Sequence, residues 1–445
     1  MPAFFFSFRY NRSMEFIKKL IPDAVLKSIR PFYHAVVAVI AGWYFGHPSR
    51  EMIVIGVTGT AGKSTTVAML ARILNSNGRK CGFITTVSFF DGESEHINIH
   101  GLSMPGGWQL QKDLAVIRSM GCQYAVVECT SEGLAQNRHL GISFQMGVLT
   151  NLSPAHLETH GGFENYKKAK GKLFRVVAKQ PSGVILVNLD DPNAGYFLSF
   201  NSKQKFGAGF KRWKTNVTDL RYLAIKTDFG FELNGVPFEV NLLGDFNKYN
   251  ALLAASTASL LGVSLSQCAL SIAEFSFIRG RMEEVKNNLG FKVIVDYAPE
   301  PADMEAALGA ISQLPHKSII HVFGSTGGHR DKAKRFEFGK ISAGFADRIV
   351  ITNDDVYNSD PQEIAENIEL GIKNNELRKG EYEIVLDRRG AIGKALSIAQ
   401  AGDIVVITGK GSEQFLVLPG NRRVVWDEVE VVKQELNKLT KIDQE

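Results

Sequence analysis

One stretch near the start of the sequence restricts the fold more than any other. Residues 52–59, MIVIGVTG, form an apolar run rich in β-branched residues and closed by glycine, which is typical of a buried strand. Residues 63–78, KSTTVAMLARILNSNG, have apolar positions at helical spacing and end on glycine. A strand, a glycine turn and a helix in this order are the usual context of a phosphate-binding loop, because the N-terminus of a helix attracts anions.

The loop departs from the usual spacing, which places glycine, four residues and then Gly-Lys-Ser/Thr. Counted back from Gly62, the first glycine falls at position 57, which is valine, and glycine stands at Gly59 instead. Both glycines still let the backbone approach phosphate oxygens. We therefore expect Lys63 to meet the β- and γ-phosphates of a nucleotide and Ser64 to bind Mg²⁺. The alternative is a glycine-rich turn that carries a lysine by chance.

Strand and helix patterns continue to alternate beyond the loop. Buried-strand patterns follow at residues 81–89, 124–129, 146–152 and 183–191. Alternation of this kind predicts a mostly parallel sheet with helices on both faces. Residues 205–243 differ, because they alternate in polarity and contain an Asn-Gly pair, and we expect an antiparallel insertion there.

A second series of strands and helices starts near Ile278. Its strands are expected at residues 291–298, 318–325, 347–354 and 403–411. The predicted fold class is therefore α/β. A P-loop-type, mostly parallel central domain is expected at residues 50–277, and a smaller Rossmann-like C-terminal domain at residues 278–445.

Residues 1–49 are expected to form an apolar N-terminal helical segment, which starts at Met1 or at Met14. The apolar run from Phe32 to Phe45 is shorter than the roughly 20 residues of an ordinary membrane span. It also lacks the small-residue cleavage site of a signal peptide. Three interpretations stay open: a helix packed on the domain behind it, an amphipathic segment over residues 14–46 that contacts the inner face of a membrane, or, against its short length, a membrane span.

Composition disfavours several classes of protein. The net charge is +5 and the basic residues are scattered, so no stripe for nucleic acid is present and we expect no nucleic-acid partner. The four cysteines form no CxxC pair, which disfavours a zinc site or a disulfide scaffold. Such cysteine usage fits the cytoplasm.

Polar residues follow two of the predicted strands. Glu128 ends the strand pattern YAVVE, and the carboxyl ends of parallel strands face the ligand crevice, so this carboxylate could hold a metal ion. His156, His160 and Lys170 come after the strand at 146–152. Two histidines in such a loop suggest a ligand site, although an isolated histidine is more often an ordinary surface or core residue.

Taken together, these motifs resemble those of the Mur ligases, and most closely the MurE type, the UDP-N-acetylmuramoyl-dipeptide: amino-acid ligases. The motifs follow the family's order over roughly residues 50–430: TGTAGKST, ECTSEGLAQNR, TNLSPAHLETHGGFENYKKAKGKLF, GDFNKYN, RGRMEEV, VDYAPEPADME, VFGSTGGHRDKAKR, DRRGAI and TGKGSE. The family's own loop is TGTxGK[ST], in which Gly59 replaces the glycine missing at position 57.

The resemblance implies a site for ATP and two Mg²⁺ ions. Its ATP-binding residues would be Gly59, Thr60, Ala61, Gly62, Lys63, Ser64, Thr65, Asn247, Asn250, Arg281 and Asp296. Its metal ligands would be Ser64, Glu128 and His156. Lys63, Lys170 and His156 would serve catalysis, with Lys170 as a carbamylated lysine.

The implied reaction joins a muramoyl-peptide acid to an amino acid in cell-wall synthesis. A carboxylate attacks the γ-phosphate of ATP, and an amine then displaces phosphate from the acyl phosphate. The muramoyl acid would meet Ser103, Thr130, Gln136 and Arg138. The amino acid would meet Arg330, Asp354, Asp355, Tyr357, Gly409 and Glu413.

The substrate elements depart from the family's pattern, while the phosphate and metal elements are intact. The family's N-terminal UDP-binding domain has no counterpart in residues 1–49. Residues 354–357 read Asp-Asp-Val-Tyr where diaminopimelate enzymes carry Asp-Asn-Pro-Arg, and the two acids suggest a cationic side chain such as lysine. Pro299 and Ser412 each replace a histidine, and Ala155 replaces an aspartate. We expect a working ligase with an altered acid and amine.

Two other functions are compatible with a nucleotide site. A ligase like folylpolyglutamate synthase is one, and the stretch ECTSEGLAQNR argues against it. A non-catalytic nucleotide-binding scaffold is the other, and the presence of both Lys63 and Lys170 argues against it.

Overall fold

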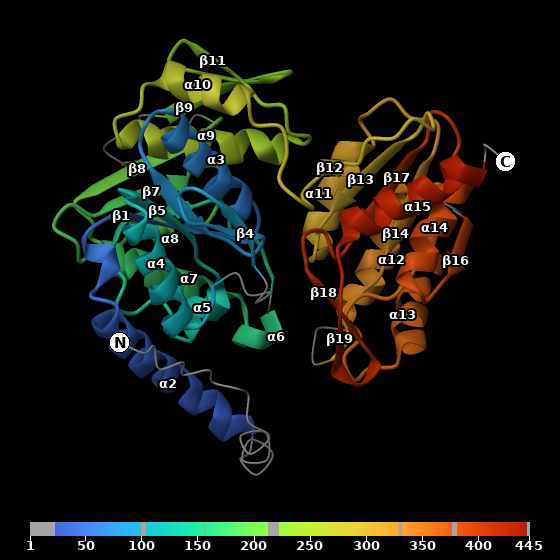
Figure 1. Cartoon of the computed structure of the whole chain (residues 1–445), viewed down its shortest axis with the longest axis horizontal. Helices are drawn as coiled ribbons and strands as arrows, with labels where there is room; N and C mark the ends of the chain where they lie inside the picture. Colours follow the sequence, from blue (N-terminus) through green and yellow to red (C-terminus); the bar gives the residue numbers. More distant parts are fainter. Residues whose placement is uncertain are drawn as a thin grey trace.

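The computed structural model describes residues 23–98, 104–155, 157–211, 222–328, 332–375 and 381–442. Two large sheets lie in separate halves of the molecule, each with helices packed around it (Figure 1). The predicted α/β class, with a mostly parallel central sheet followed by a smaller α/β unit, is confirmed. The exact domain boundary at residues 277 and 278 stays a prediction.

The central sheet has the strand order β11-β10-β9-β8-β7-β6-β1-β5-β2-β3-β4. Its strands are β1 (Ile53–Thr58), β2 (Cys81–Ile84), β3 (Ser88–Phe90), β4 (Glu95–Ile97), β5 (Tyr124–Glu128), β6 (Phe144–Leu149), β7 (Val184–Asn188), β8 (Gln204–Gly209), β9 (Tyr222–Thr227), β10 (Gly230–Leu233) and β11 (Val236–Glu239). In the middle of the sheet, β2, β5, β1, β6, β7, β8 and β9 pair in parallel with their neighbours in this order. Antiparallel pairs extend the sheet at both edges, from β2 to β3 and from β9 to β10.

Helices cover both faces of this sheet. They are α3 (Lys63–Ser76), α4 (Gly107–Ser119), α5 (Ser131–Ala135), α6 (Leu157–His160), α7 (Phe163–Val177), α8 (Ala194–Leu198), α9 (Asp245–Leu260) and α10 (Leu265–Ala273). Side chains of β1 alternate between the two cores. Ile55 and Val57 pack in the core with α3 and α9, whereas Val54 packs in the core with α4 and α7. A strand buried on both faces explains the continuous apolar run in the sequence.

Two segments of the central domain differ from the sequence-based expectation. The antiparallel insertion expected at residues 205–243 is correct for β9, β10 and β11, whose Asn234-Gly235 turn has positive φ at both residues. It is wrong for β8, which pairs in parallel with β7 and β9 and so belongs to the main sheet. The strand expected at residues 81–89 is interrupted at residues 85–87, between β2 and the antiparallel β3.

The C-terminal sheet has the order β12-β13-β17-β14-β15-β16, and only β12 among its described strands pairs antiparallel. Its strands are β12 (Glu283–Glu284), β13 (Lys292–Asp296), β14 (Ile319–Phe323), β15 (Arg348–Ile351), β16 (Glu381–Ile384) and β17 (Ile404–Thr408). One core contains α11 (Pro301–Ile311), α12 (Ala333–Phe345) and α13 (Pro361–Lys373), and the other contains α14 (Arg388–Ile398) and α15 (Glu428–Ile442). The strands β18 (Phe415–Leu418) and β19 (Arg422–Val425) form a hairpin, and the short helix η2 (Pro419–Asn421) connects them.

Helix α2 (Asp23–Tyr44), followed by η1 (Pro48–Arg50), lies at the outer edge of the central half (Figure 1). Its small residues Ala38 and Ala41 are fully buried, and Ala38 lies directly against Gly107 of α4. Its large apolar residues point to solvent, with Phe32 72% and Trp43 76% exposed. The helix thus packs on the domain through its small side chains and exposes its large ones. None of the described helices is long and apolar enough to span a membrane.

Candidate active site

The loop at residues 59–62 connects β1 to α3 and rests against helix α9. Gly62 is the residue before α3 and has φ +77°, and a Cβ atom there would lie 2.2 Å from Oδ1 of Asn250. Glycine suits this position, because any other residue would be strained at this φ and would collide with the Asn250 side chain. Asn250 in turn donates from Nδ2 to Oδ1 of Asn247 at 2.9 Å. The structure therefore brings both asparagines predicted on the nucleotide side to the back of the loop.

The other side of the loop is fixed by residues that follow β6. The backbone N–H groups of Thr60 and Ala61 donate to the carbonyl oxygen and to Oδ1 of Asn151, both at 2.9 Å. Thr60 Oγ1 donates to the Ser153 carbonyl at 3.1 Å and lies 3.0 Å from the Tyr166 hydroxyl. Sequence reasoning missed Asn151, although its place just after a strand in the motif TNL was a signal. These contacts fix the loop before any nucleotide arrives.

A buried carboxylate lies next to the start of α3. Glu128, at the end of β5, is 2% exposed, and Ser64 Oγ donates to its Oε2 at 2.7 Å. Thr86, in the break between β2 and β3, donates to the same carboxylate from its backbone N–H at 3.0 Å and from Oγ1 at 3.1 Å. Carboxylate and hydroxyl oxygens are ligands that Mg²⁺ takes. Ser64 and Glu128 thus fit the expected metal site, and Thr86 is a contact that the sequence did not reveal.

Of the two histidines noted after β6, His156 lies outside the described residues. His160 ends α6, and its Nε2 lies 3.1 Å from Oγ of Ser131.

Two lysines donate hydrogen bonds to backbone carbonyls of the loop. Lys63 Nζ donates to the carbonyl of Thr60 at 2.8 Å, and Lys170 Nζ, from α7, donates to the carbonyl of Gly59 at 2.6 Å. Burial lowers the pKa of Lys63, while the carboxylate of Glu128 raises it. Lys170 is 1% exposed, and burial together with the Lys63 charge lowers its pKa well below the usual range. Burial and the positive charge of Lys63 therefore both favour the neutral amine form of Lys170.

A cleft of about 830 Å³ separates the loop from the C-terminal half. Its central-domain wall includes Thr60–Thr65, Glu128 and Asn250, and its C-terminal wall includes Arg281, Asp296 and Asp303. The guanidinium carbon of Arg281 lies 4.5 Å from the ring centroid of Tyr297. Asp296 accepts the backbone N–H of Met282 at 2.7 Å, and burial raises its pKa. Residues predicted from both halves of the chain thus face one cleft.

The residues predicted to hold the acid substrate form a connected group. Thr130 caps helix α5, since its Oγ1 accepts the backbone N–H of Gly133 at 3.2 Å. Arg138 donates to Oε1 of Gln136 at 2.8 Å and to the carbonyl of Met104 at 2.6 Å. Thr130 and Arg138 line the cleft, and Gln136 is linked to it through Arg138. Ser103 lies outside the described residues.

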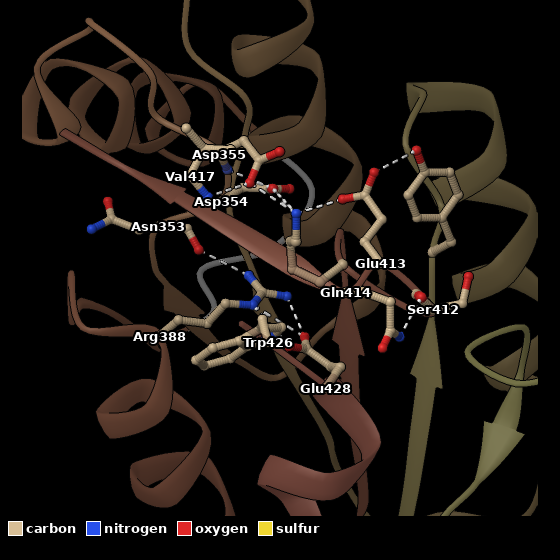
Figure 2. A network of polar contacts seen from close by, with 12 residues as sticks. Asn353, Asp354, Asp355, Arg388, Ser412, Glu413, Gln414, Val417, Trp426 and Glu428 are labelled. Carbon is tan, nitrogen blue, oxygen red and sulfur yellow. Dashed lines mark hydrogen bonds and ion pairs between the residues drawn. The ribbon is translucent and has the colours of Figure 1, made fainter. Parts of the chain in front are cut away.

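Three of the residues predicted near the incoming amino acid, Asp354, Asp355 and Glu413, lie close together (Figure 2) and surround Lys410. Lys410 Nζ lies 2.8 Å from Oδ1 of Asp355, 3.7 Å from Oδ1 of Asp354 and 2.5 Å from Oε2 of Glu413. Burial opposes the charge on Lys410, but the three carboxylates together raise its pKa. The two aspartates that were expected to attract a cationic substrate therefore already share an internal cation. The sequence motif TGKGSE contained this lysine without indicating its partners.

A small cavity of about 30 Å³ lies beside this cluster and is lined by Asp354, Asp355, Gly409 and Glu413. Glu413 also accepts a hydrogen bond from the hydroxyl of Tyr297, at 3.3 Å. Tyr357 is not among the residues that line either cavity, and a Cβ atom at Gly328 would lie 3.5 Å from its ring. Arg330 lies outside the described residues.

A fully buried ion pair supports the cluster from below (Figure 2). Arg388 contacts the carboxylate of Glu428, and its terminal nitrogens donate to the carbonyls of Asn353 at 3.0 Å and Thr408 at 2.8 Å. Trp426 donates from its indole nitrogen to the same carboxylate. Arg388 thereby ties the loop after β15 to the end of β17, which are the two places that supply Asp354 and Lys410.

Comparisons with known proteins identify the family. A family model described as the Mur ligase middle domain matches residues 57–258, and one described as Mur ligase, glutamate ligase domain, matches residues 280–411. A UDP-N-acetylmuramyl-tripeptide synthetase of Roseiflexus sp. (strain RS-1) is 33% identical over 429 residues, which cover 92% of this chain and 83% of the relative. The chain belongs to the Mur ligase family.

Two solved structures are similar to this Mur ligase, one in sequence and fold and one in fold alone. A structure described as UDP-N-acetylmuramoyl-L-alanyl-D-glutamate--2,6-diaminopimelate ligase is 26% identical with a TM-score of 0.59, covering 91% of this chain and 83% of that one. A Mycobacterium tuberculosis folylpolyglutamate synthase complexed with ADP and AMPPCP has a TM-score of 0.66 over 85% of this chain and 93% of that one. Its identity is 16%, so it shares the fold alone. The predicted ATP-dependent acid–amino-acid ligase of the MurE type is confirmed at the level of the family.

Proposed function

We propose that this Mur ligase adds an amino acid to a carboxylate of a muramoyl-peptide cell-wall precursor, with conversion of ATP to ADP and phosphate. One observation supports this most strongly. Lys63 and the Ser64–Glu128 pair line one wall of the interdomain cleft, and Arg281 and Asp296 line the other. ATP bound to the loop would therefore contact both halves of the chain.

In the first step the precursor carboxylate attacks the γ-phosphorus of ATP, the bond to the β-phosphate oxygen breaks, and an acyl phosphate and ADP result. Both reactants are anions, so the step needs positive charge. Lys63 would supply it at the phosphates, and Arg138 would bind the acid at the same cleft. Mg²⁺ held by Ser64, Glu128 and His156 would neutralise further phosphate charge and help align the reactants.

In the second step the nitrogen of the amino acid attacks the acyl carbon, and the bond to phosphate breaks. Water would destroy the acyl phosphate, so the cleft must close before the first step. Arg281 and Asp296 lie on the opposite wall and would approach the nucleotide on closure. The amino acid would approach along the side of the large cleft that Glu413 lines.

Carbamylation of Lys170 is part of the proposal. Only a neutral amine attacks carbon dioxide, and the lowered pKa of Lys170 favours that form. The product, a carbamate, is an anion, and it would replace the repulsion between Lys170 and Lys63 by attraction. Burial protects it from water, since Lys170 is 1% exposed.

The amino acid is proposed to differ from the diaminopimelate named for the solved relative. The distal carboxylate of diaminopimelate would approach the carboxylates of Asp354 and Asp355, and position 357 offers no arginine to bind it. Three carboxylates surround the single ammonium group of Lys410, so the cluster keeps a negative charge. This charge supports a cationic side chain such as that of lysine.

We also propose a location. The enzyme would work in the cytoplasm, with α2, within residues 14–46, resting on the inner face of the membrane. Its outward face carries exposed Phe32, Val39 and Trp43, together with Tyr44, which packs its ring against Trp108 of α4. Tryptophan and tyrosine side chains favour the boundary between lipid and water.

A screen of amino acids for stimulated phosphate release tests the proposed function. Muramoyl dipeptides linked to uridine diphosphate or to lipid would serve as acids, and a Lys63→Ala variant as the negative control. We expect release of ADP and phosphate only when acid and amino acid are both present. Activity with a folate and glutamate alone would favour the folylpolyglutamate alternative, and nucleotide binding without turnover of any pair would favour the scaffold.

A further inference from the structure

We propose that Asp303 is the general base that takes a proton from the incoming amine as the amide bond forms, which rests on the proposed ligase function. Asp303 lies in the first turn of α11, and its backbone N–H donates to the carbonyl of Glu300 at 3.0 Å. Its half-buried side chain lines the cleft opposite Lys63. The carboxylate makes no hydrogen bond or ion pair with the residues that the structure describes.

The neighbouring carboxylates on the same wall already have hydrogen-bond or ion-pair partners within the protein. Glu413 accepts hydrogen bonds from Lys410 and Tyr297. Asp296 accepts the backbone N–H of Met282, and Glu300 lies 3.5 Å from Lys334 Nζ. Asp303 is the one whose oxygens stay available to a substrate.

Asp303 also lines the large cleft next to a residue that lines the small cavity. Tyr297, Pro299 and Glu413 line both the large cleft and the small cavity beside the acidic cluster. Met304, the next residue after Asp303, lines the small cavity as well. An amine that approaches an acyl phosphate at Lys63 from the side of the cleft lined by Glu413 would therefore come close to the Asp303 carboxylate.

The charges around Asp303 suit a base that works near neutral pH. Burial raises its pKa to about 6, Lys63 and Arg281 oppose this rise, and Glu300 and Asp296 add to it. The Tyr166 hydroxyl faces it from α7 and stays protonated, because burial raises its pKa. At pH 7 and above Asp303 is mostly ionised and can accept a proton.

The proposed step balances as follows. The neutral amine nitrogen donates its electron pair to the acyl carbon, and the carbon–oxygen bond to phosphate breaks, so inorganic phosphate leaves with that electron pair. Asp303 accepts the proton that the nitrogen loses and later passes it to water. The other proton of the original ammonium group goes to solvent before the attack.

The test compares Asp303→Asn with a matched control, Glu305→Gln, which removes an exposed carboxylate from the same helix. Amide formation is measured with the acid and amino acid that the screen identifies, from pH 5 to 9. Acyl-phosphate formation is measured separately, by trapping with hydroxylamine. We expect Asp303→Asn to lower kcat for the amide by roughly 100-fold or more. Hydroxamate formation and the KM for ATP should stay near those of the unchanged enzyme.

The pH profile gives the second readout. The unchanged enzyme and Glu305→Gln should gain kcat as pH rises through about 6, because the base acts only when ionised. Asp303→Asn should lose this rise of kcat with pH, which forms the acid limb of the pH profile. Retention of both the limb and the rate, or equal loss of hydroxamate and amide, would overturn the role of Asp303. An unchanged enzyme that forms neither product with any pair would instead overturn the ligase function, and this proposal with it.

Discussion

Lys170 has an environment that an ordinary lysine avoids: it is 1% exposed, and its Nζ meets a carbonyl oxygen and, 4.6 Å away, the ring centroid of Tyr166. No carboxylate within the described residues forms an ion pair with it. A buried ammonium group without an ionic partner costs several kcal/mol. The cost disappears if the amine is neutral or carbamylated, which is why this residue carries a decisive prediction.

Lys170→Ala should therefore lower kcat by about 100-fold or more, because the anion that forms on Lys170 would be gone. Short carboxylates such as formate or acetate should restore part of the rate, since they fit the space of the missing side chain. The matched control is Lys168→Ala, which removes an exposed lysine from the same helix. An unimpaired Lys170→Ala enzyme would remove the carbamate from the mechanism.

Arg388 is a buried charged residue that stabilises the fold through its ion pair with Glu428. Arg388→Met should destabilise the C-terminal half by about 3–5 kcal/mol, because Glu428 would stay buried without its partner. Urea unfolding measures this change. Arg72→Met, which breaks an ion pair whose side chains are 49% and 65% exposed, should cost less than about 1 kcal/mol. Equal effects of the two variants would contradict the role of burial.

How far the sequence reveals such residues depends on their separation along the chain. Gly62, Lys63 and Ser64 are neighbours in one loop, so their motif could be interpreted directly. Thr86 reaches Glu128 across 42 residues and Lys410 reaches Asp355 across 55, and no local pattern encodes such a pairing. Both contacts depend on which strands lie side by side, which only the folded sheet determines.

At the scale of elements, α2 carries the clearest prediction. Phe32, Val39 and Trp43 share its exposed face, and replacing all three by serine should weaken binding to vesicles rich in anionic lipid by at least about tenfold. Vesicle co-sedimentation measures this. The control is Phe229→Ser, which changes an 81% exposed residue far along the chain in the β9–β10 turn. Unchanged sedimentation of the triple variant would contradict the membrane contact.

The sequence predicted the helix in this segment, but it left open whether the helix packs or anchors. The structure shows packing through Ala38 and Ala41, with the bulky residues left outside. Residue size alone did not indicate this, because large apolar side chains are usually the buried ones. The glycine at position 107 of α4 explains it, since the close approach there leaves room only for small side chains.

For the whole molecule, the prediction concerns the cleft. On the proposed function, a non-hydrolysable ATP analogue with Mg²⁺ should draw the two halves together, because its phosphates would contact Lys63 on one wall and Arg281 on the other. Small-angle X-ray scattering should then give a smaller radius of gyration than without nucleotide. Lys63→Ala should not show this decrease at the same analogue concentration. Compaction of that variant equal to that of the unchanged enzyme would argue against closure through the loop.

Gly280, at the junction of the two halves, has a bearing on how such a motion proceeds. Its φ is +62°, and a Cβ atom there would lie 2.2 Å from the backbone of Gly411 and Ser412. The junction and the segment that carries Glu413 therefore press against each other without any side chain between them. On the proposed function, a swing of the halves about Gly280 would carry the segment with Glu413 along with it, and entry of the second substrate would then be coupled to the closure that seals in the first.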